Sequence, residues 1–299
     1  MEHFISGFVS IVGRTNVGKS TFLNTLIGEK ISITSFKPQT TRNRIIGVKH
    51  IENGQIIFLD TPGIHRPKHK LGEAMVKTAL TACKEVDLIV MMVEPALPKE
   101  GDKFIIERIK ETGKPVILLI NKIDKVKKSE LLPIIDAYSK LYDFEEIIPI
   151  SALKAEGIED TIEAIKKYLP EGVRYYPEDV VTDQLERFMV SEIIREKIIK
   201  HTRDEVPHSV AVEVTTWEEK RDRRGRPLII IYADILVERN SQKNIIIGKA
   251  GNKLKQIAME ARREIEALLA SKVYLNVWVK VKKKWRTDTK VLKEMGYYQ

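Results

Sequence analysis

Residues 1–169 alternate between short apolar runs and longer segments in which apolar residues recur every three or four positions. The runs predict buried strands, and the longer segments predict helices that cover them. The predicted strands are 7–12, 45–51, 55–59, 88–93, 116–120 and 147–150, and the predicted helices are 18–28, 70–84, 99–112, 128–141 and 157–169. This alternation predicts an α/β domain with a mostly parallel six-stranded sheet. Only residues 52–54 separate the second strand from the third, which predicts an antiparallel hairpin.

The periodicity breaks in the segment 169–179, which contains two prolines and a glycine. We therefore predict a first domain at 1–172, a linker at 173–183 and a second domain at 184–299. The predicted elements of the second domain are a helix near 184–201, strands near 208–217 and 227–238, a short apolar segment at 244–247, a helix near 252–269, a strand at 273–281 and a short helix at 288–295. The order α-β-β-α-α-β differs from that of the first half and predicts a separate α+β domain.

The composition is that of a folded two-domain protein, because 299 residues exceed one ordinary core and 43% of them are hydrophobic. The single cysteine, Cys83, excludes a disulfide framework and a cysteine-rich zinc site. The N-terminus has no basic segment followed by an apolar run, and no apolar run is long enough to span a bilayer. We therefore expect a cytoplasmic protein.

Positive charge is concentrated in the second domain. Residues 182–299 carry 25 Lys and Arg against 17 Asp and Glu, whereas residues 1–181 carry 26 against 25. A basic half beside a neutral half indicates a polyanionic partner, either a nucleic acid or an anionic membrane. A lysine-rich surface without a dedicated partner, as in a thermophilic protein, is the alternative explanation.

A phosphate-binding motif, GxxxxGK[ST], lies between the first predicted strand and the first predicted helix. Its glycines let backbone N–H groups surround a β-phosphate, and the helix N-terminus adds partial positive charge. Lys19 can reach the β- and γ-phosphates, and the Ser20 hydroxyl is suited to bind Mg²⁺. The nucleotide-binding residues predicted here are Gly13, Arg14, Thr15, Asn16, Val17, Gly18, Lys19, Ser20 and Thr21.

Three further motifs, at residues 60–63, 121–124 and 151–153, each follow a predicted strand, where open α/β sheets bind their ligands. In Asp60-Thr-Pro-Gly63 the aspartate can hold Mg²⁺ and Gly63 can offer its N–H to a γ-phosphate. In Asn121-Lys-Ile-Asp124 the Asp124 carboxylate can accept two hydrogen bonds from guanine, which adenine cannot supply. The predicted nucleotide site therefore also includes Asp60, Gly63, Asn121, Lys122, Asp124, Ser151, Ala152 and Leu153, and it favours GTP and GDP over ATP.

The polar stretch from Lys37 to Arg42 has the length of a switch loop, with a plain flexible loop as the alternative. We favour Thr41 over Thr40 as a ligand that joins the Mg²⁺ shell when a γ-phosphate is present. The predicted metal ligands are therefore Ser20, Thr41 and Asp60, and the predicted catalytic residues are Lys19, Thr41 and Gly63.

The group that would orient the attacking water is not evident. Ras-type GTPases place a glutamine directly after the DxxG motif, where this chain has Ile64, so we expect slow intrinsic hydrolysis. Asn16 aligns with an asparagine that helps to bind K⁺ in related GTPases, and such an ion could replace an arginine finger. A purely structural role of Asn16 in the loop is an alternative of equal weight.

A GxxG loop, Gly248-Lys-Ala-Gly251, lies between two predicted helices of the second domain. In a KH module such glycines let a phosphate backbone approach while an adjacent apolar groove receives about four unstacked bases. The pattern is weak alone, but within the α-β-β-α-α-β order it predicts a type II KH domain that binds single-stranded RNA. The predicted RNA-binding residues are Ile247, Gly248, Lys249, Ala250, Gly251, Lys253, Leu254 and Lys255.

Three other features of this domain have two interpretations each. The basic run from Lys280 to Arg286 can contact phosphates or form a solvated strand edge. Tyr274 and Trp278 lie opposite the valine face of the last strand, and we expect them to pack against a helix rather than to stack on bases. Arginines at 221, 223, 224 and 226 crowd a hairpin turn, either as an accessory RNA contact or as plain surface.

A GTPase domain with the motifs GRTNVGKS, QTTR, DTPG and NKID followed by a type II KH domain resembles the Era family. The segments 176–179 and 187–197 also look like that family's domain junction and first KH helix, so the resemblance covers essentially the whole chain. It implies a GTPase that uses Mg²⁺, binds the 3′ end of 16S ribosomal RNA, and assists rRNA processing and small ribosomal subunit assembly as a GTP/GDP switch. It also implies a peripheral contact with the inner face of the cell membrane. We expect a monomer.

Two other functions remain open at this level. The chain could be a constitutive RNA clamp whose nucleotide only stabilises it, and RNA affinity would then not depend on the nucleotide. It could also be a membrane or cell-cycle signalling GTPase, and lipid binding would then survive neutralisation of Lys249 and Lys253.

Overall fold

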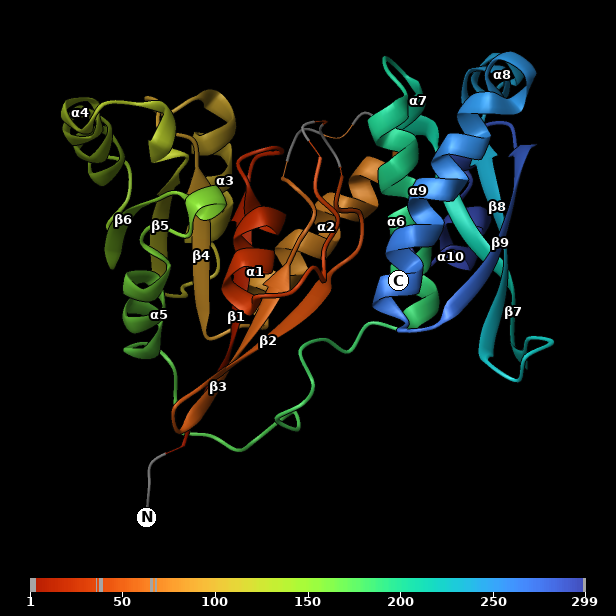
Figure 1. The fold of residues 1–299 in the computed structure, drawn as a ribbon. Coiled ribbons are helices and arrows are strands. Elements are labelled where there is room, and N and C mark those ends of the chain that lie inside the picture. Colours follow the sequence, from red (N-terminus) through yellow and green to blue (C-terminus); the bar gives the residue numbers. More distant parts are fainter. Residues whose placement is uncertain (1–3, 36, 38–39, 65–66, 68, 298–299) are drawn as a thin grey trace. The chain divides into compact units, whose positions relative to one another are not determined.

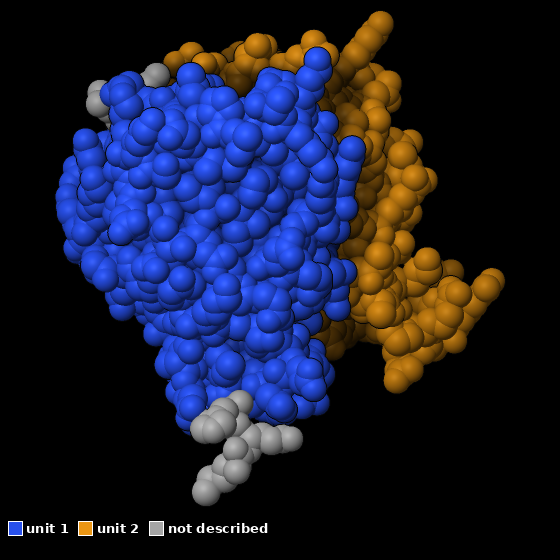
Figure 2. Space-filling model, turned by 90° about the vertical axis from the view of Figure 1, so that its left-hand side faces the viewer, with its two compact units in different colours: residues 1–34, 39–183 blue, residues 35–38, 184–299 orange. Residues whose placement is uncertain are grey.

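The computed structural model describes residues 4–35, 37, 40–64, 67 and 69–297, so Pro38 and Gln39 of the expected switch loop lie outside the described residues. The chain forms two compact units, one of residues 1–34 and 39–183 and one of residues 35–38 and 184–299 (Figure 2). Within the described part, no helix has both the length and the apolar composition needed to cross a membrane.

The first unit is built on a six-stranded sheet in the order β2-β3-β1-β4-β5-β6 (Figure 1). Its strands are β1 (Ile5–Gly13), β2 (Ile45–Ile51), β3 (Gly54–Asp60), β4 (Leu88–Val93), β5 (Val116–Asn121) and β6 (Glu146–Ile150). Strands β2 and β3 pair antiparallel, and every other neighbouring pair is parallel. The predicted sheet and its hairpin are confirmed.

Helices cover this sheet, of which strands β3, β4 and β5 are buried at every residue. They are α1 (Lys19–Ile27), α2 (Lys70–Lys84), α3 (Glu100–Lys110), α4 (Lys128–Ser139) and α5 (Ile158–Lys166), with single turns η1 (Ile123–Lys125) and η2 (Ala152–Lys154). Side chains of α2, α3 and α4 form one apolar cluster with β4 and β5. Because β1, β3, β4 and β5 are parallel, their carboxyl ends lie at one edge, which is the edge that carries the predicted nucleotide motifs.

The segment predicted as a linker is bound along the outer strand β2. The Val48 N–H donates to the Val181 carbonyl at 2.8 Å, and the Thr182 hydroxyl donates to the Ile46 carbonyl at 2.7 Å. Farther along, Gln55 accepts hydrogen bonds from the N–H groups of Tyr175 and Tyr176. These contacts satisfy backbone groups that an edge strand otherwise exposes, and they place residues up to Asp183 in the first unit.

The second unit has a three-stranded sheet in the order β7-β8-β9, with β7 antiparallel and β9 parallel to β8. Its elements are α6 (Glu186–His201), α7 (Val206–Ser209), β7 (Ala211–Arg221), β8 (Pro227–Val237), α8 (Asn240–Ile247), η3 (Lys249–Gly251), α9 (Asn252–Leu268), β9 (Lys272–Val281), η4 (Trp285–Thr287) and α10 (Thr289–Glu294). The predicted α+β order is confirmed. The short turn α7 was not expected, and α8 begins four residues before the apolar run that indicated it.

One face of this sheet forms the core with α6, α8 and α9. Residues Val273, Val277 and Val279 of β9 point into that core, as the alternation predicted. Tyr274 and Trp278 lie on the opposite face and are 51% and 47% exposed. The expectation that they pack against a helix is therefore wrong, because α6, α8 and α9 all cover the valine face.

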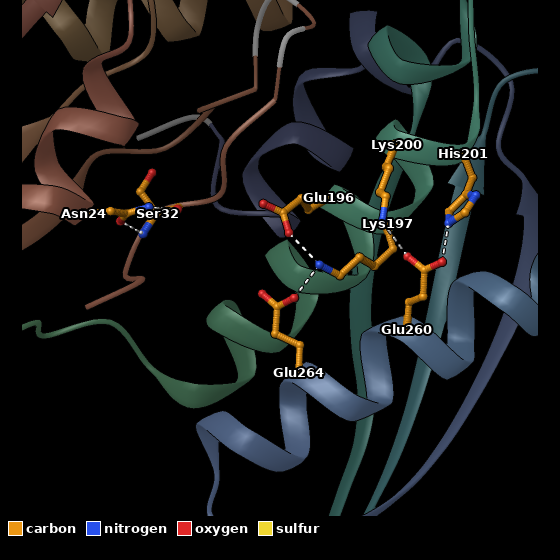
Figure 3. Close-up of polar contacts among 8 residues, drawn as sticks. All are labelled: Asn24, Ser32, Glu196, Lys197, Lys200, His201, Glu260 and Glu264. Carbon is orange, nitrogen blue, oxygen red and sulfur yellow. Dashed lines mark hydrogen bonds and ion pairs between the residues drawn. The ribbon is translucent and has the colours of Figure 1, made fainter. Parts of the chain in front are cut away.

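Ion pairs join α6 to α9 along one side of this core (Figure 3). The Lys197 ammonium binds the carboxylates of Glu196 and Glu264, and the Lys200 ammonium lies 3.0 Å from Glu260. His201 also bonds to Glu260, through Nε2, at 2.9 Å. Although burial opposes its charge, the two carboxylates hold the pKa of Lys197 above its usual value. The network fixes the register of the helix that follows the GxxG loop.

Candidate functional site

The phosphate-binding loop runs from β1 into α1 with three residues at positive φ, namely Gly13, Asn16 and Gly18. At Gly18 a side chain would collide with the Asn121 amide, so the loop and β5 can meet only through a glycine. The Lys19 ammonium donates to the carbonyls of Gly13 and Arg14 at 3.3 and 3.1 Å. Burial lowers the pKa of Lys19 to about 8, against the opposing effect of Asp60. A polyphosphate beside this lysine would favour its charged form and raise its pKa again.

A cluster of hydroxyl groups surrounds the Asp60 carboxylate at the end of β3. Ser20, Ser32 and Thr41 each direct a hydroxyl at Asp60 Oδ2, at 2.8, 3.0 and 3.5 Å. The Ser20 and Thr41 hydroxyls are 2.9 Å apart. The structure thus brings the three predicted metal ligands together.

This donor set fits Mg²⁺. The second carboxylate oxygen, Asp60 Oδ1, is buried without a hydrogen-bond partner among the described residues. Burial raises the pKa of Asp60, although the nearby Lys19 ammonium and the three hydroxyl hydrogen bonds oppose that rise. Hydroxyl and carboxylate oxygens are hard ligands of the kind that Mg²⁺ prefers. Ser20, Thr41 and Asp60 would therefore hold the ion.

The base pocket is assembled from β5, η1 and η2. The Asn121 amide donates to the Val17 carbonyl at 2.8 Å and accepts from the Ala152 N–H at 2.9 Å. The Ser151 hydroxyl donates to the Asp124 carboxylate at 2.6 Å, and this bond holds the pKa of Asp124 below its usual value. Asp124 is thus an oriented, ionised acceptor that could pair with two adjacent donors of a base. Leu153 is 77% exposed, so of the predicted pocket residues it contributes at most through its backbone.

Gly63 lies against the phosphate-binding loop. A Cβ at this position would come within 2.7 Å of Thr15 Cγ2 and 2.9 Å of Thr15 N, so only glycine fits. The next N–H, that of Ile64, donates to the Gly13 carbonyl at 3.2 Å. The Ile64 side chain is 1% exposed and belongs to the core cluster of α2, β4 and β5. It therefore takes no part in positioning water.

Sequence reasoning missed several residues that support the site. Glu94, directly after β4, receives the Lys122 ammonium at 2.7 Å, and the same ammonium donates to the Asn16 carbonyl at 2.5 Å. Although burial opposes ionisation, Lys122 holds the pKa of Glu94 below its usual value. Its position at the carboxyl end of a parallel strand was the available signal.

Two other supports are recognisable only in three dimensions. Asp102, 2% exposed at the start of α3, lies 3.3 Å from the Arg14 guanidinium and so ties the phosphate-binding loop to that helix. Ser32 is held by Asn24, which bonds to both backbone groups of Ser32 (Figure 3). Neither follows from a motif, because both depend on segments that meet only after folding.

The GxxG loop in the second unit joins α8 to α9 through two glycines at positive φ, Gly248 and Gly251. A Cβ at Gly248 would come within 2.6 Å of the Lys253 Cβ, so the loop can turn here only with glycine. Lys249, Ala250 and Lys255 are exposed, whereas Ile247, Lys253 and Leu254 are half-buried. Beside the loop lies a cavity of about 500 Å³ lined by residues that include Lys253, Ile245, Gln242, Arg239 and Arg203. The lining also includes the carboxylates of Asp204 and Glu205, so the basic side chains of Arg203, Arg239 and Lys253 are the part of this rim that suits a nucleic acid strand.

Comparison with known proteins follows the same division. The family model described as "50S ribosome-binding GTPase" matches residues 8–122, and the model described as "KH domain" matches residues 205–286. The GTPase Era of Clostridium botulinum (strain Loch Maree, type A3) is 53% identical over 295 residues, which cover 98% of each chain. The chain belongs to the Era family of GTPases.

Two solved Era structures match the chain over its whole length. One, Era in complex with MgGDPNP and nucleotides 1506–1542 of 16S ribosomal RNA, is 45% identical with a TM-score of 0.95 and covers 99% of this chain and 100% of its own. The other, an Aquifex aeolicus Era variant bound to GDP·AlF4⁻, is 44% identical with a TM-score of 0.94 and the same coverage. The Era resemblance of the motifs is thereby confirmed, with both domains in one chain.

Proposed function

We propose that this Era-family GTPase binds the 3′ end of 16S ribosomal RNA through its KH domain and assists rRNA processing and small ribosomal subunit assembly. The observation that carries this proposal is the joint presence of a phosphate-binding loop with an oriented Asp124 carboxylate and a GxxG loop, in a chain that resembles over its whole length an Era solved with that RNA. The family model named for the large subunit matches only residues 8–122, before the RNA-binding unit begins. It does not weigh against a small-subunit target.

We assign the chemistry of hydrolysis to positioning and charge neutralisation. Lys19 pairs with the β- and γ-phosphates, and Gly63 donates its N–H to the γ-phosphate. Mg²⁺, when bound, neutralises charge that develops between these phosphates. Thr41 joins the ion only with a γ-phosphate present, which would order the switch loop. With Ile64 buried, intrinsic hydrolysis is slow.

The switch is tested by the affinity for a 16S 3′-end oligonucleotide with GDP and with a non-hydrolysable GTP analogue. We expect tighter binding with the GTP analogue, by about 5–150-fold, the usual range of coupling between two sites. A scrambled oligonucleotide and a Lys249→Glu/Lys253→Glu variant serve as controls and should bind weakly in both states. Equal affinities in the two states would leave a constitutive RNA clamp instead of a switch.

We also propose that K⁺ takes part in hydrolysis beside Asn16. The residue sits at the apex of the phosphate-binding loop with φ of 67°, and its carbonyl is held by Lys122. A cation there would stabilise transition-state charge as an arginine finger does, for which a gain of about 10-fold or more is expected. GTPase rates in KCl and in NaCl at equal ionic strength check this, with Asn16→Ala as the control that should abolish the difference. Equal rates for the native chain would contradict it.

The remaining proposals concern the setting of the protein. We propose a cytoplasmic monomer with domains at 1–172 and 184–299, joined by residues 173–183. The excess of basic residues in 182–299 also supports a peripheral contact with the inner face of the cell membrane. RNA binding and this contact would then use the same basic surface.

A further inference from the structure

The outer face of the second unit's sheet, opposite α6, α8 and α9, carries three neighbouring aromatic side chains. We call this set the aromatic face: Tyr232 on β8, and Tyr274 and Trp278 on β9. The Tyr232 ring lies 5.4 Å from that of Trp278 and 6.3 Å from that of Tyr274. In the register Tyr232 is opposite Asn276, midway between the other two. Tyr232 therefore supports both outer rings, which remain about half exposed.

An arginine-rich turn lies at one end of this face, where β7 connects to β8. Asp222 organises it, since its carboxylate accepts from the N–H groups of Arg224 and Arg226 and from the Arg226 side chain at 2.8–3.0 Å. Arg221 is also engaged, through the Gly225 carbonyl. The side chains of Arg223 and Arg224 are exposed, and among the described residues their guanidinium groups form no ion pair. The turn thus presents two uncompensated positive charges on a fixed backbone.

The turn and the aromatic face are continuous. Arg221 pairs with Pro227 at the start of β8, and the following residue, Leu228, pairs with Lys272 of β9. Tyr274 is two residues farther along the same side of β9, and Trp278 lies four residues beyond it. At about 3.3 Å per residue the two rings are roughly 13 Å apart along the strand. An extended chain of alternating anions and flat rings would match this surface.

We propose that the aromatic face and the arginine-rich turn form a second binding surface for single-stranded RNA, separate from the GxxG loop. Bases stack on Tyr274 and Trp278, and the adjoining phosphates pair with Arg223 and Arg224. Aromatic side chains on a sheet are a known platform for unstacked bases, and every base has a face that can stack. The GxxG loop joins two helices that pack on the other face of the sheet, so one groove cannot serve both.

The charges favour RNA over a protein partner at this surface. Two lysines of the outer face are already paired, Lys280 with Asp234 and Lys220 with Glu218, each at 2.6 Å. Glu213, opposite Asp234 on the same face, is an exposed carboxylate, so the sheet itself carries no net positive charge and the positive charge is confined to the turn at its end. A protein ligand would need matched carboxylates at that one end, whereas an RNA strand carries a phosphate at every position.

The test uses the full chain with its GxxG loop disabled by Lys249→Glu/Lys253→Glu, and a 12-nucleotide oligouridine as the probe. In this background Tyr274→Ala/Trp278→Ala should weaken binding at least tenfold, since each stacked base contributes substantially to affinity. Tyr175→Ala, at an equally exposed tyrosine of the first unit, is the matched control and should have no effect. Quenching of tryptophan fluorescence by the probe should disappear in a Trp278→Phe variant.

The proposed phosphate contacts are tested separately, by the dependence of RNA affinity on salt concentration. Arg223→Glu/Arg224→Glu should reduce the slope of log affinity against log salt by about 1.4, from two contacts on a single strand. Arg262→Glu/Arg263→Glu changes the net charge equally on exposed positions of α9 and should leave the slope nearly unchanged. Binding that is indifferent to both outer-face variants would overturn the proposal, even if the GxxG variant abolishes 16S binding. Conversely, loss in the outer-face variants supports it even if the GxxG loop proves not to bind RNA.

Discussion

An Asp124→Asn variant is expected to lose about 10³–10⁴-fold in GTP affinity, because a site built to bond a polar group rejects a ligand that leaves it unpaired. The Asp124 carboxylate is held by the Ser151 hydroxyl at 2.6 Å and can accept from both guanine N1–H and the 2-amino group. The asparagine amide would present one donor where guanine also has a donor. Xanthine carries a carbonyl at that position, so the variant should gain affinity for xanthosine triphosphate.

Titration of each variant with fluorescent GTP and XTP measures this change of preference. Asp160→Asn removes an exposed carboxylate in the first turn of α5 and is the matched control, with no expected change. The asparagine oxygen can still accept the Ser151 hydrogen bond, so the fold of the pocket should persist. A variant that keeps its preference for GTP would show that guanine is read elsewhere.

The nucleotide site was predictable because its chemistry is carried by short motifs at the ends of strands. Lys19, Asp60, Asn121 and Asp124 each lie at or shortly after the end of a strand whose position is fixed by its own apolar run. Once the strands are parallel, these residues must converge at one edge of the sheet. The local pattern of strands and motifs was therefore enough to predict that these residues lie close together.

The supporting residues could not be predicted in the same way. Ser32 and Asp102 act through contacts between segments that are far apart in the sequence, and the geometry of such contacts depends on the whole packing of the unit. Glu94 lies at the predicted edge, but a carboxylate there has several possible partners until Lys122 is placed. The ordered course of residues 175–182 along β2 was also hidden, because prolines and a glycine indicate a break in periodicity without showing where the chain then lies.

The second domain shows the same limit at its outer face. Alternation in β9 correctly separated Val273, Val277 and Val279 from Tyr274 and Trp278. Alternation does not show whether a further helix also covers the face that carries Tyr274 and Trp278. Large aromatic side chains are buried to a large extent on average, which favoured such packing. Their exposure in the structure is therefore the observation that turns an expected packing site into a candidate binding surface.

An Asp60→Asn variant is expected to separate catalysis from stability. Hydrolysis should fall by about 10³-fold, since loss of the metal ligand removes about 4 kcal/mol of transition-state stabilisation. The pKa of Asp60 is raised by burial, so its stabilising effect is complete below the unfolded-state pKa and is lost as pH rises through the folded-state value. At pH 7 without Mg²⁺ the native carboxylate therefore destabilises the fold, and asparagine should unfold no earlier than the native chain.

Thermal unfolding in a metal chelator at pH 5 and pH 7, together with GTPase rates against Mg²⁺ concentration, measures both effects. Relative to Asp60→Asn, the native chain should become less stable as the pH rises. Asp234→Asn is the matched control, because that buried carboxylate of the second unit is paired with the Lys280 ammonium at 2.6 Å and lies outside the phosphate-binding loop. It should be destabilised while its Mg²⁺ dependence is unchanged. Destabilisation of Asp60→Asn in the chelator would contradict this expectation. It would mean that the hydroxyls of Ser20, Ser32 and Thr41 already stabilise the Asp60 carboxylate without Mg²⁺.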